Sequence, residues 1–260
     1  AAGCRPRRGT GMRTVVAAFL VVLASVCGAR AEPSEACAAP VVLGDFPLER
    51  VSAAVTKGRP FKIVVFGTTS STLGGSDGAR DAYPWRLEAE LKRLMPGTAV
   101  EVVSLAKPRQ TAEKMVKTFE RTLADEKPTL VIWQTGTFDA MQGVNPGEFL
   151  NSLTDGVEKM KSAGVDVILV NMQYNPRTEL MVANEAYADN MRWVARERQV
   201  PLFDRLSLMR TWNDTGVIDL YAATKDITIA KRLHDCIGRA LASLIIDAGR
   251  LTALESKTPR

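Results

Sequence analysis

The sequence predicts a three-layer α/β fold, in which a five-stranded parallel sheet is covered by helices on both faces. Short apolar runs alternate with helical stretches from Phe61 to the end of the chain, and this alternation is typical of a parallel sheet between helices. The runs are nearly uninterrupted, as in strands that are buried on both faces. The 260 residues suffice for one large domain with a substantial core.

Five apolar, β-branched runs are the expected strands. The first, FKIVVF, is closed by Gly67, and the third reads LVIW. The expected strands span residues 61–66, 99–105, 130–133, 165–170 and 200–203. In such sheets the functional residues lie in loops at the carboxyl ends of the strands, so these loops are where we expect a site.

The expected helices follow the strands and carry recognisable ends. Pro84 opens the first and Gly97 stops it, which is the usual asymmetry of helix termini. Asn145 and Pro146 cap and begin another, and Asp226 is expected to cap the last. The expected helices span residues 84–94, 110–125, 145–163, about 183–194, and from 226 onward.

The first 31 residues are expected to be upstream sequence and a cleaved export signal. Met12 is the expected start, Arg13 is the positive region, and Thr14–Val26 is an apolar run of 13 residues. Ala29 and Ala31 have the spacing that signal peptidase recognises. A membrane-spanning helix needs about 20 residues. We therefore expect a periplasmic or secreted protein with an N-terminal segment at 32–58, a domain at 59–250 and a tail at 251–260, and no stable membrane span after cleavage.

Cleavage after Ala31 would also remove the excess of positive charge. Of the 34 basic residues five precede Glu32, and none of the 29 acidic residues does, so the remaining chain has no net charge. This argues against a nucleic-acid partner.

Cys37 and Cys236 would remain, and in an oxidising compartment they are expected to form a disulfide worth roughly 3–5 kcal/mol. Two unpaired thiols are the alternative. The cysteines lack the clustered ligands of a metal site, and we expect neither a metal nor a cofactor.

The loop after the first strand, Gly67–Gly75 (GTTSSTLGG), is the first candidate for chemistry. It matches neither glycine-rich phosphate-binding pattern. A hydroxyl just after a strand and near a helix start could instead act as a nucleophile, with backbone N–H groups to hold an oxyanion. A polar turn without catalytic function is the alternative.

The chain resembles the SGNH, or GDSL, hydrolase family over most of residues 46–246. Phe61–Gly74 followed by YPWRLE is similar to the first family block, and Leu130–Ala140 (LVIWQTGTFDA) to the third. Asn171–Arg177 and the last helix, with Cys236, resemble a secreted bacterial branch. The resemblance implies the flavodoxin-like SGNH hydrolase fold. It also implies a serine esterase or acyl hydrolase acting on ester-linked acyl groups of a small molecule or an envelope polymer.

The first three of the family's motifs depart from the pattern. In the first block one extra residue follows Gly67, and the register from Thr72 selects Ser70 as nucleophile, whereas counting from Gly67 selects Thr69. The second block has no glycine, and Phe138 replaces the asparagine of the third block. Loss of one such oxyanion donor costs about 3–4 kcal/mol of transition-state stabilisation.

The acid and base of the family's fourth block are also missing. Lys225–Thr228 stands where Asp-x-x-His is expected, and the one histidine of the chain, His234, falls six residues later. Ser70 therefore needs His234, oriented by Asp226 or Asp235, or a non-standard base such as Lys225 or Asp139. Against this, His234 can be a packed residue at the edge of the core, and Asp139 an ordinary helix cap.

Two functions remain open from the sequence. One is a serine ester hydrolase with Ser70, His234 and Asp139 as its catalytic candidates. The other is a catalytically inactive SGNH-fold protein that serves as a binding or scaffolding module in the cell envelope. The oligomeric state is not predicted.

Overall fold

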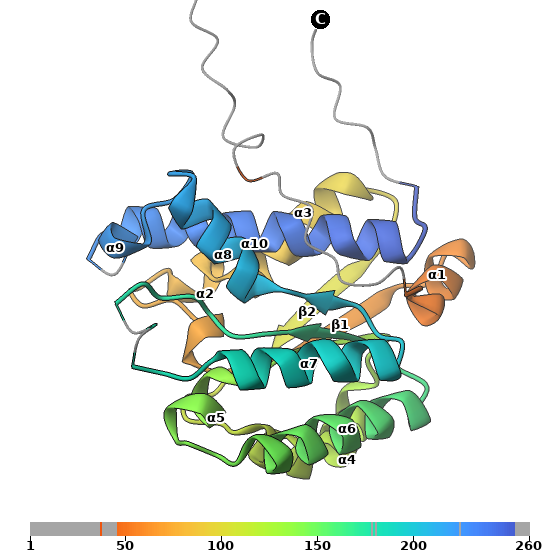
Figure 1. The fold of residues 1–260 in the computed structure, drawn as a ribbon. Helices are drawn as coiled ribbons and strands as arrows, with labels where there is room; N and C mark the ends of the chain where they lie inside the picture. The colour runs from red at the N-terminus through yellow and green to blue at the C-terminus, as the bar shows by residue number, and fades with distance from the viewer. Residues whose placement is uncertain (1–36, 38–45, 178, 180, 224, 253–260) are drawn as a thin grey trace, which may run out of the picture. The chain divides into compact units, whose positions relative to one another are not determined.

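The computed structural model describes residues 37, 46–177, 179, 181–223 and 225–252. Its centre is a five-stranded sheet in the order β2-β1-β3-β4-β5, with every pair of neighbouring strands parallel. Helices lie on both faces (Figure 1). The predicted three-layer α/β fold is therefore confirmed.

The strands agree with the apolar runs to within a few residues. They are β1 (Phe61–Phe66), β2 (Val100–Ser104), β3 (Leu130–Gln134), β4 (Asp166–Val170) and β5 (Leu202–Phe203). The central strand β3 is buried throughout, whereas β2 lies at an edge and only its first residue, Val100, is buried. The fifth strand is shorter than predicted, because only two of its residues pair with β4.

The predicted helices are present, and shorter ones lie in segments where none was predicted. The helices are α1 (Glu49–Thr56), α2 (Gly78–Asp81), α3 (Tyr83–Leu94), α4 (Ala112–Glu126), α5 (Thr137–Met141), α6 (Pro146–Ser162), α7 (Glu185–Glu197), α8 (Arg205–Asp214), α9 (Leu220–Ala223), α10 (Ile227–Ala248) and the 3-10 turn η2 (Thr69–Ser71). Asp226 caps α10, since its carboxylate accepts the Thr228 N–H at 2.8 Å. Asn145 caps α6 in the same way through Gly147 N.

Two groups of helices cover the sheet (Figure 1). The helices α3 and α10 pack against each other on one face, and α4, α6 and α7 cover the other. On the second face Trp133 of β3 is fully buried and lies against Gly156 of α6, where an added Cβ would come within 2.5 Å of the indole ring. A small residue on α6 thus lets this helix approach the sheet closely.

The N-terminal segment is bonded to the domain at the end of the sheet where the strands begin. The Asp166 carboxylate, at the start of β4, accepts the N–H groups of Arg50 and Val51 in the first turn of α1, at 2.8 and 3.0 Å. The Leu48 N–H donates to the carbonyl of Ala248, at the end of α10. These bonds fix α1 to β4 and to the last helix.

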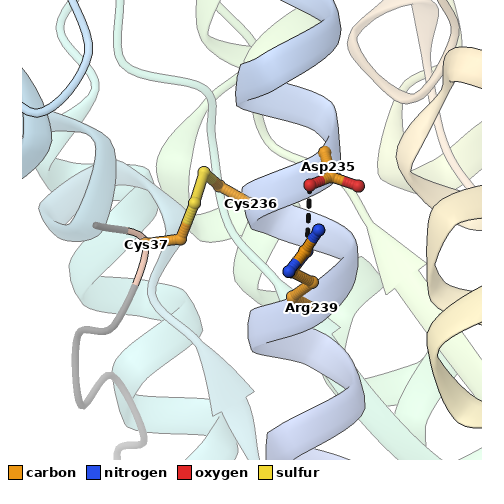
Figure 2. Close-up of a disulfide and its surroundings, with 4 residues drawn as sticks. All are labelled: Cys37, Asp235, Cys236 and Arg239. Carbon is orange, nitrogen blue, oxygen red and sulfur yellow. Dashed lines mark hydrogen bonds and ion pairs between the residues drawn. A yellow bond between two sulfur atoms is a disulfide. The ribbon is translucent and has the colours of Figure 1, made fainter. Parts of the chain in front are cut away.

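A disulfide joins Cys37 to Cys236 in the middle of α10, which confirms the predicted pairing (Figure 2). The two cysteines are 199 residues apart in sequence and both are buried. The expected export signal, and all but two residues of the expected tail, lie outside the described residues. Among the helices that the structure describes, none has the length and apolarity needed to cross a membrane.

Candidate functional site

The candidate site lies at the carboxyl ends of β1 and β3, where the strand order changes direction. The chain runs from β1 outward to β2 and then returns to the other side of β1 to form β3. Loops on either side of such a point diverge and leave a crevice, which is where open α/β sheets bind ligands. The turn η2, with Ser70, follows β1, and Gln134 is the last residue of β3.

A cavity of about 670 Å³ opens at this place. Hydroxyl and amide side chains line one part of it and apolar side chains another. Its described lining residues are Thr68, Thr69, Ser70, Thr72, Leu73, Arg109, Thr137, Phe138, Met141, Gln173, Tyr174, Asn175, Val182, Asn184, Met209, Leu220, Ala223, Ala230, Leu233 and His234. Among them only Arg109 is permanently charged, and none is acidic.

Gln134 holds the loop after β1 in place. This side chain is fully buried, and its Oε1 atom lies within hydrogen-bond distance of four donors. The Thr68 N–H is 2.9 Å away, and the hydroxyls of Thr68, Ser71 and Ser70 are 3.0, 3.0 and 3.2 Å away. A carbonyl oxygen has two lone pairs, so the hydroxyls compete for it. Ser70, the most distant, is the hydroxyl most available to donate to a ligand.

Arg205, the first residue of α8, is bonded to Ser70. Its Nη2 atom donates to Ser70 Oγ at 3.1 Å, and Nη1 donates to the Ser70 carbonyl at 3.3 Å. The residue is fully buried, and its Nε has no hydrogen-bond partner among the described residues.

No described carboxylate is paired with the Arg205 guanidinium. Burial lowers the pKa of Arg205 to about 10, and among the described residues only the phenol of Tyr83 opposes this shift. At neutral pH Arg205 therefore remains a cation. A buried charge without a partner costs several kcal/mol, so the site carries unbalanced positive charge immediately behind the Ser70 hydroxyl.

His234 lines the same cavity, but its ring is held in an orientation unsuited to a base. The Tyr83 N–H donates to His234 Nδ1 at 3.0 Å. A backbone N–H can only donate, so Nδ1 carries the lone pair and the proton of the neutral ring is on Nε2. Burial, and then the nearby charge of Arg205, lower the pKa of His234 to about 4. At neutral pH the imidazole is thus a neutral N–H donor.

The aspartates considered as orienting groups for His234 are engaged elsewhere. Asp235 accepts from Arg239 Nε at 2.9 Å (Figure 2), and Asp226 caps α10. The carboxylate of Asp81 raises the pKa of His234 slightly against the effect of burial. Asp81 itself forms ion pairs with Arg86 and Lys231. None of these described carboxylates bonds to the imidazole.

Asp139, the third catalytic candidate, is not among the residues that line the cavity. It is buried at the start of α5, where its carboxylate accepts the N–H of Ala112 at 2.8 Å and that of Gly136 at 3.3 Å. Burial raises its pKa, and these bonds oppose the rise. Asp139 thus joins the first turns of α4 and α5. The structure brings Ser70 and His234 to one cavity, and their catalytic roles, with that of Asp139, stay predictions.

The sequence did not single out Gln134, Arg205 or Tyr83. Gln134 ends an apolar strand, and Arg205 follows β5, so the rule that sites lie at strand carboxyl ends could have found both.

Lys225, the other candidate base, is exposed and does not line the cavity. In the described part of the chain no group of three His, Cys, Asp or Glu side chains could hold a metal. The absence of a metal or cofactor stays an expectation.

Gly67→Ala is expected to lower the free energy of unfolding by about 1–3 kcal/mol, because overpacking a filled site shifts its neighbours. A Cβ at Gly67 would lie 2.7 Å from the Cβ of Ser71, whose hydroxyl bonds to Gln134 and Tyr83. Gly74→Ala is the control in the same loop, since its Cβ would meet nothing within 4 Å. Equal urea denaturation midpoints for the two variants would contradict the expectation.

Comparison with known proteins places this geometry in a family. The chain is similar to the solved structure of TesA, with 22% identity, a TM-score of 0.57, and 70% of this chain and 99% of that one covered. It is similar to the psychrotrophic esterase EstA from Pseudoalteromonas sp. (14% identity, TM-score 0.54, 70% and 94% covered). It is also similar to a catalytic mutant of Axe2, an acetylxylan esterase from Geobacillus stearothermophilus (18% identity, TM-score 0.59, 71% and 94% covered).

At these identities the solved structures show the fold alone, which is that of the SGNH/GDSL esterases. The search of curated proteins finds no match. The sequence profile of the non-GDSL lipase-like family matches residues 36–251, which include every described element and the whole cavity lining. The expected resemblance is therefore confirmed, and the chain belongs to the non-GDSL lipase-like family.

Proposed function

We propose that this protein is a non-hydrolytic, ligand-binding relative of the SGNH/GDSL esterases that works outside the cytoplasm. The observation that carries the proposal is the hydrogen bond from the Tyr83 N–H to His234 Nδ1. Because of this bond, the neutral His234 ring is a hydrogen-bond donor in the cavity, whereas a serine nucleophile needs an acceptor that takes its proton.

The surroundings of Ser70 support the same conclusion. Its hydroxyl is bonded to Gln134 and Arg205, and neither an amide nor a guanidinium cation accepts a proton at neutral pH. Phe138 contributes an apolar wall to the cavity at the position where the family pattern has an asparagine donor. The cavity itself remains large enough for a small molecule.

Export is the second part of the proposal. The apolar run at residues 14–26, followed by the Ala-x-Ala pattern, supports secretion to an oxidising compartment. The Cys37–Cys236 disulfide is the kind of bond that persists there. Two of the solved structures named above are esterases, and this chain has a cavity on the same fold but no described group that activates Ser70.

Intact-mass analysis after fluorophosphonate treatment tests the proposal. Residues 32–260 are incubated with the reagent beside an active serine esterase, which confirms that the reagent labels an activated serine. We expect no adduct on this chain, because no described group activates Ser70. A stoichiometric adduct that is absent from Ser70→Ala would overturn the proposal and establish a serine hydrolase with an unorthodox base.

A further inference from the structure

The charges around the cavity indicate what kind of ligand it takes. Arg205 is a fully buried cation without a described carboxylate partner, and it reaches the cavity through its hydrogen bond to Ser70 Oγ. Arg109 lines the cavity, and it takes part in none of the ion pairs or side-chain hydrogen bonds seen in the described part of the chain. With no acidic side chain among the described lining residues, both charges favour a negatively charged ligand.

The hydrogen-bonding groups of the cavity also favour a negatively charged ligand. His234 presents Nε2–H, because its Nδ1 is occupied by the Tyr83 N–H. The Ser70 hydroxyl is the most weakly held of the donors around Gln134 Oε1, so its hydrogen can turn to a ligand. A site with several donors and an unbalanced cation suits the oxygens of an anion, since charge-assisted hydrogen bonds are the strong ones.

Another part of the cavity wall is apolar. Met209, Leu220 and Leu233 are buried side chains of α8, α9 and α10 that line it. Their wall offers no hydrogen-bonding group to a ligand, and burial of apolar ligand surface against it is favourable. One end of the ligand is therefore polar, and the other is apolar.

We propose that the cavity binds a small amphiphilic carboxylate, whose anionic group lies at Ser70 and His234 in front of Arg205 and whose apolar part lies against Met209, Leu220 and Leu233. This inference rests on the proposed function, since it takes the cavity as a binding site. It assigns to Arg205 the role of a positioning residue that recognises ligand charge through Ser70.

Isothermal titration of residues 32–260 with octanoate and with octanamide tests the inference. The two molecules have the same tail and differ in head-group charge. We expect octanoate to bind at least about tenfold more tightly than octanamide, which corresponds to ~1.4 kcal/mol. Acetate, which has the head group alone, should bind more weakly than octanoate.

Variants then identify the source of the preference. Arg205→Met removes the charge and is expected to shift the ratio of the two dissociation constants toward one while octanamide binding persists, and Arg205→Lys should retain more of the preference than Arg205→Met. Gln134→Glu places a carboxylate on the atom that Ser70 contacts, and it should reduce octanoate binding by competing for Arg205. Thermal melting shows whether each variant is folded.

Three results would overturn the inference: equal binding of octanoate and octanamide, an unchanged ratio in folded Arg205→Met, or no binding of either molecule. A hydrolysis assay separates failure of this inference from failure of the proposed function. If the chain releases nitrophenolate from p-nitrophenyl octanoate, and Ser70→Ala does not, the non-hydrolytic function is wrong, while the charge preference is still read from the ratio.

Discussion

The double variant Cys37→Ala/Cys236→Ala should unfold with a free energy roughly 5 kcal/mol lower than that of the disulfide-bonded chain. The bond closes a loop of 199 residues, and in the chain-entropy model a loop of this length restricts the unfolded chain by about that amount. Most domains have a total stability of only about 5–15 kcal/mol, so the variant should be close to unfolding at physiological temperature. Guanidinium denaturation of residues 32–260 measures the difference.

Reduction of the wild-type chain provides the control. Cys236 is fully buried, so the alanine variant also loses some packing, whereas reduction removes the bond alone. Dithiothreitol should lower the wild-type denaturation midpoint and leave the double variant unchanged. A wild-type midpoint that does not respond to complete reduction, verified by thiol titration, would show that the cross-link contributes nothing to stability.

Acid should destabilise the protein through His234. The pKa of this residue is about 4 in the folded chain and near 6.5 when unfolded, so between these values the unfolded chain binds a proton that the folded chain does not. The free energy of unfolding therefore falls as pH is lowered from 6.5 to 4, by about 3 kcal/mol at ~1.4 kcal/mol per pKa unit. Above pH 6.5 His234 contributes no pH dependence.

His234→Asn is the matched control for this effect. Asparagine places an amide oxygen where Nδ1 lies, so it can still accept the Tyr83 N–H, but it does not titrate. Asp139 and Asp166, whose pKa values burial raises, contribute to both chains and cancel in the comparison. The wild-type and variant stabilities should converge or cross as pH falls. If the two curves run parallel from pH 7 to pH 4, His234 is not held neutral in the folded protein.

Local patterns predicted those features of the fold that depend on neighbouring residues. The run FKIVVF predicts β1 to the residue, because a strand buried on both faces requires continuous apolar sequence. The Asp226 cap was predicted from the residue types at the start of the helix. The helix α8 was not predicted: Asp204, which caps it by accepting the Ser207 N–H, follows a strand of only two residues and was not recognised as a helix start.

The site depended on contacts that sequence patterns do not contain. Nothing in the residues around Arg205 indicates that it is fully buried, since arginine is rarely so. The donor state of His234 follows from the N–H of Tyr83, 151 residues away in sequence. The resemblance to the family led to Ser70 and the loop after β1, which line the cavity, while the catalytic role of Ser70 stays a prediction. It could not reveal that Gln134 and Arg205 hold the hydroxyl of that serine.

The hydrogen bond between Leu48 and Ala248 has a consequence for how the domain can be attached to other structures. It holds the start of α1 and the end of α10 together at the end of the sheet where the strands begin, opposite the cavity. A fusion partner, an affinity tag or a solid support joined directly after α10 would therefore begin away from the cavity mouth, whereas the chain before α1 is tied through Cys37 to Cys236, two residues from His234. The domain could be immobilised on a sensor surface through the end of α10, with its ligand cavity facing solution.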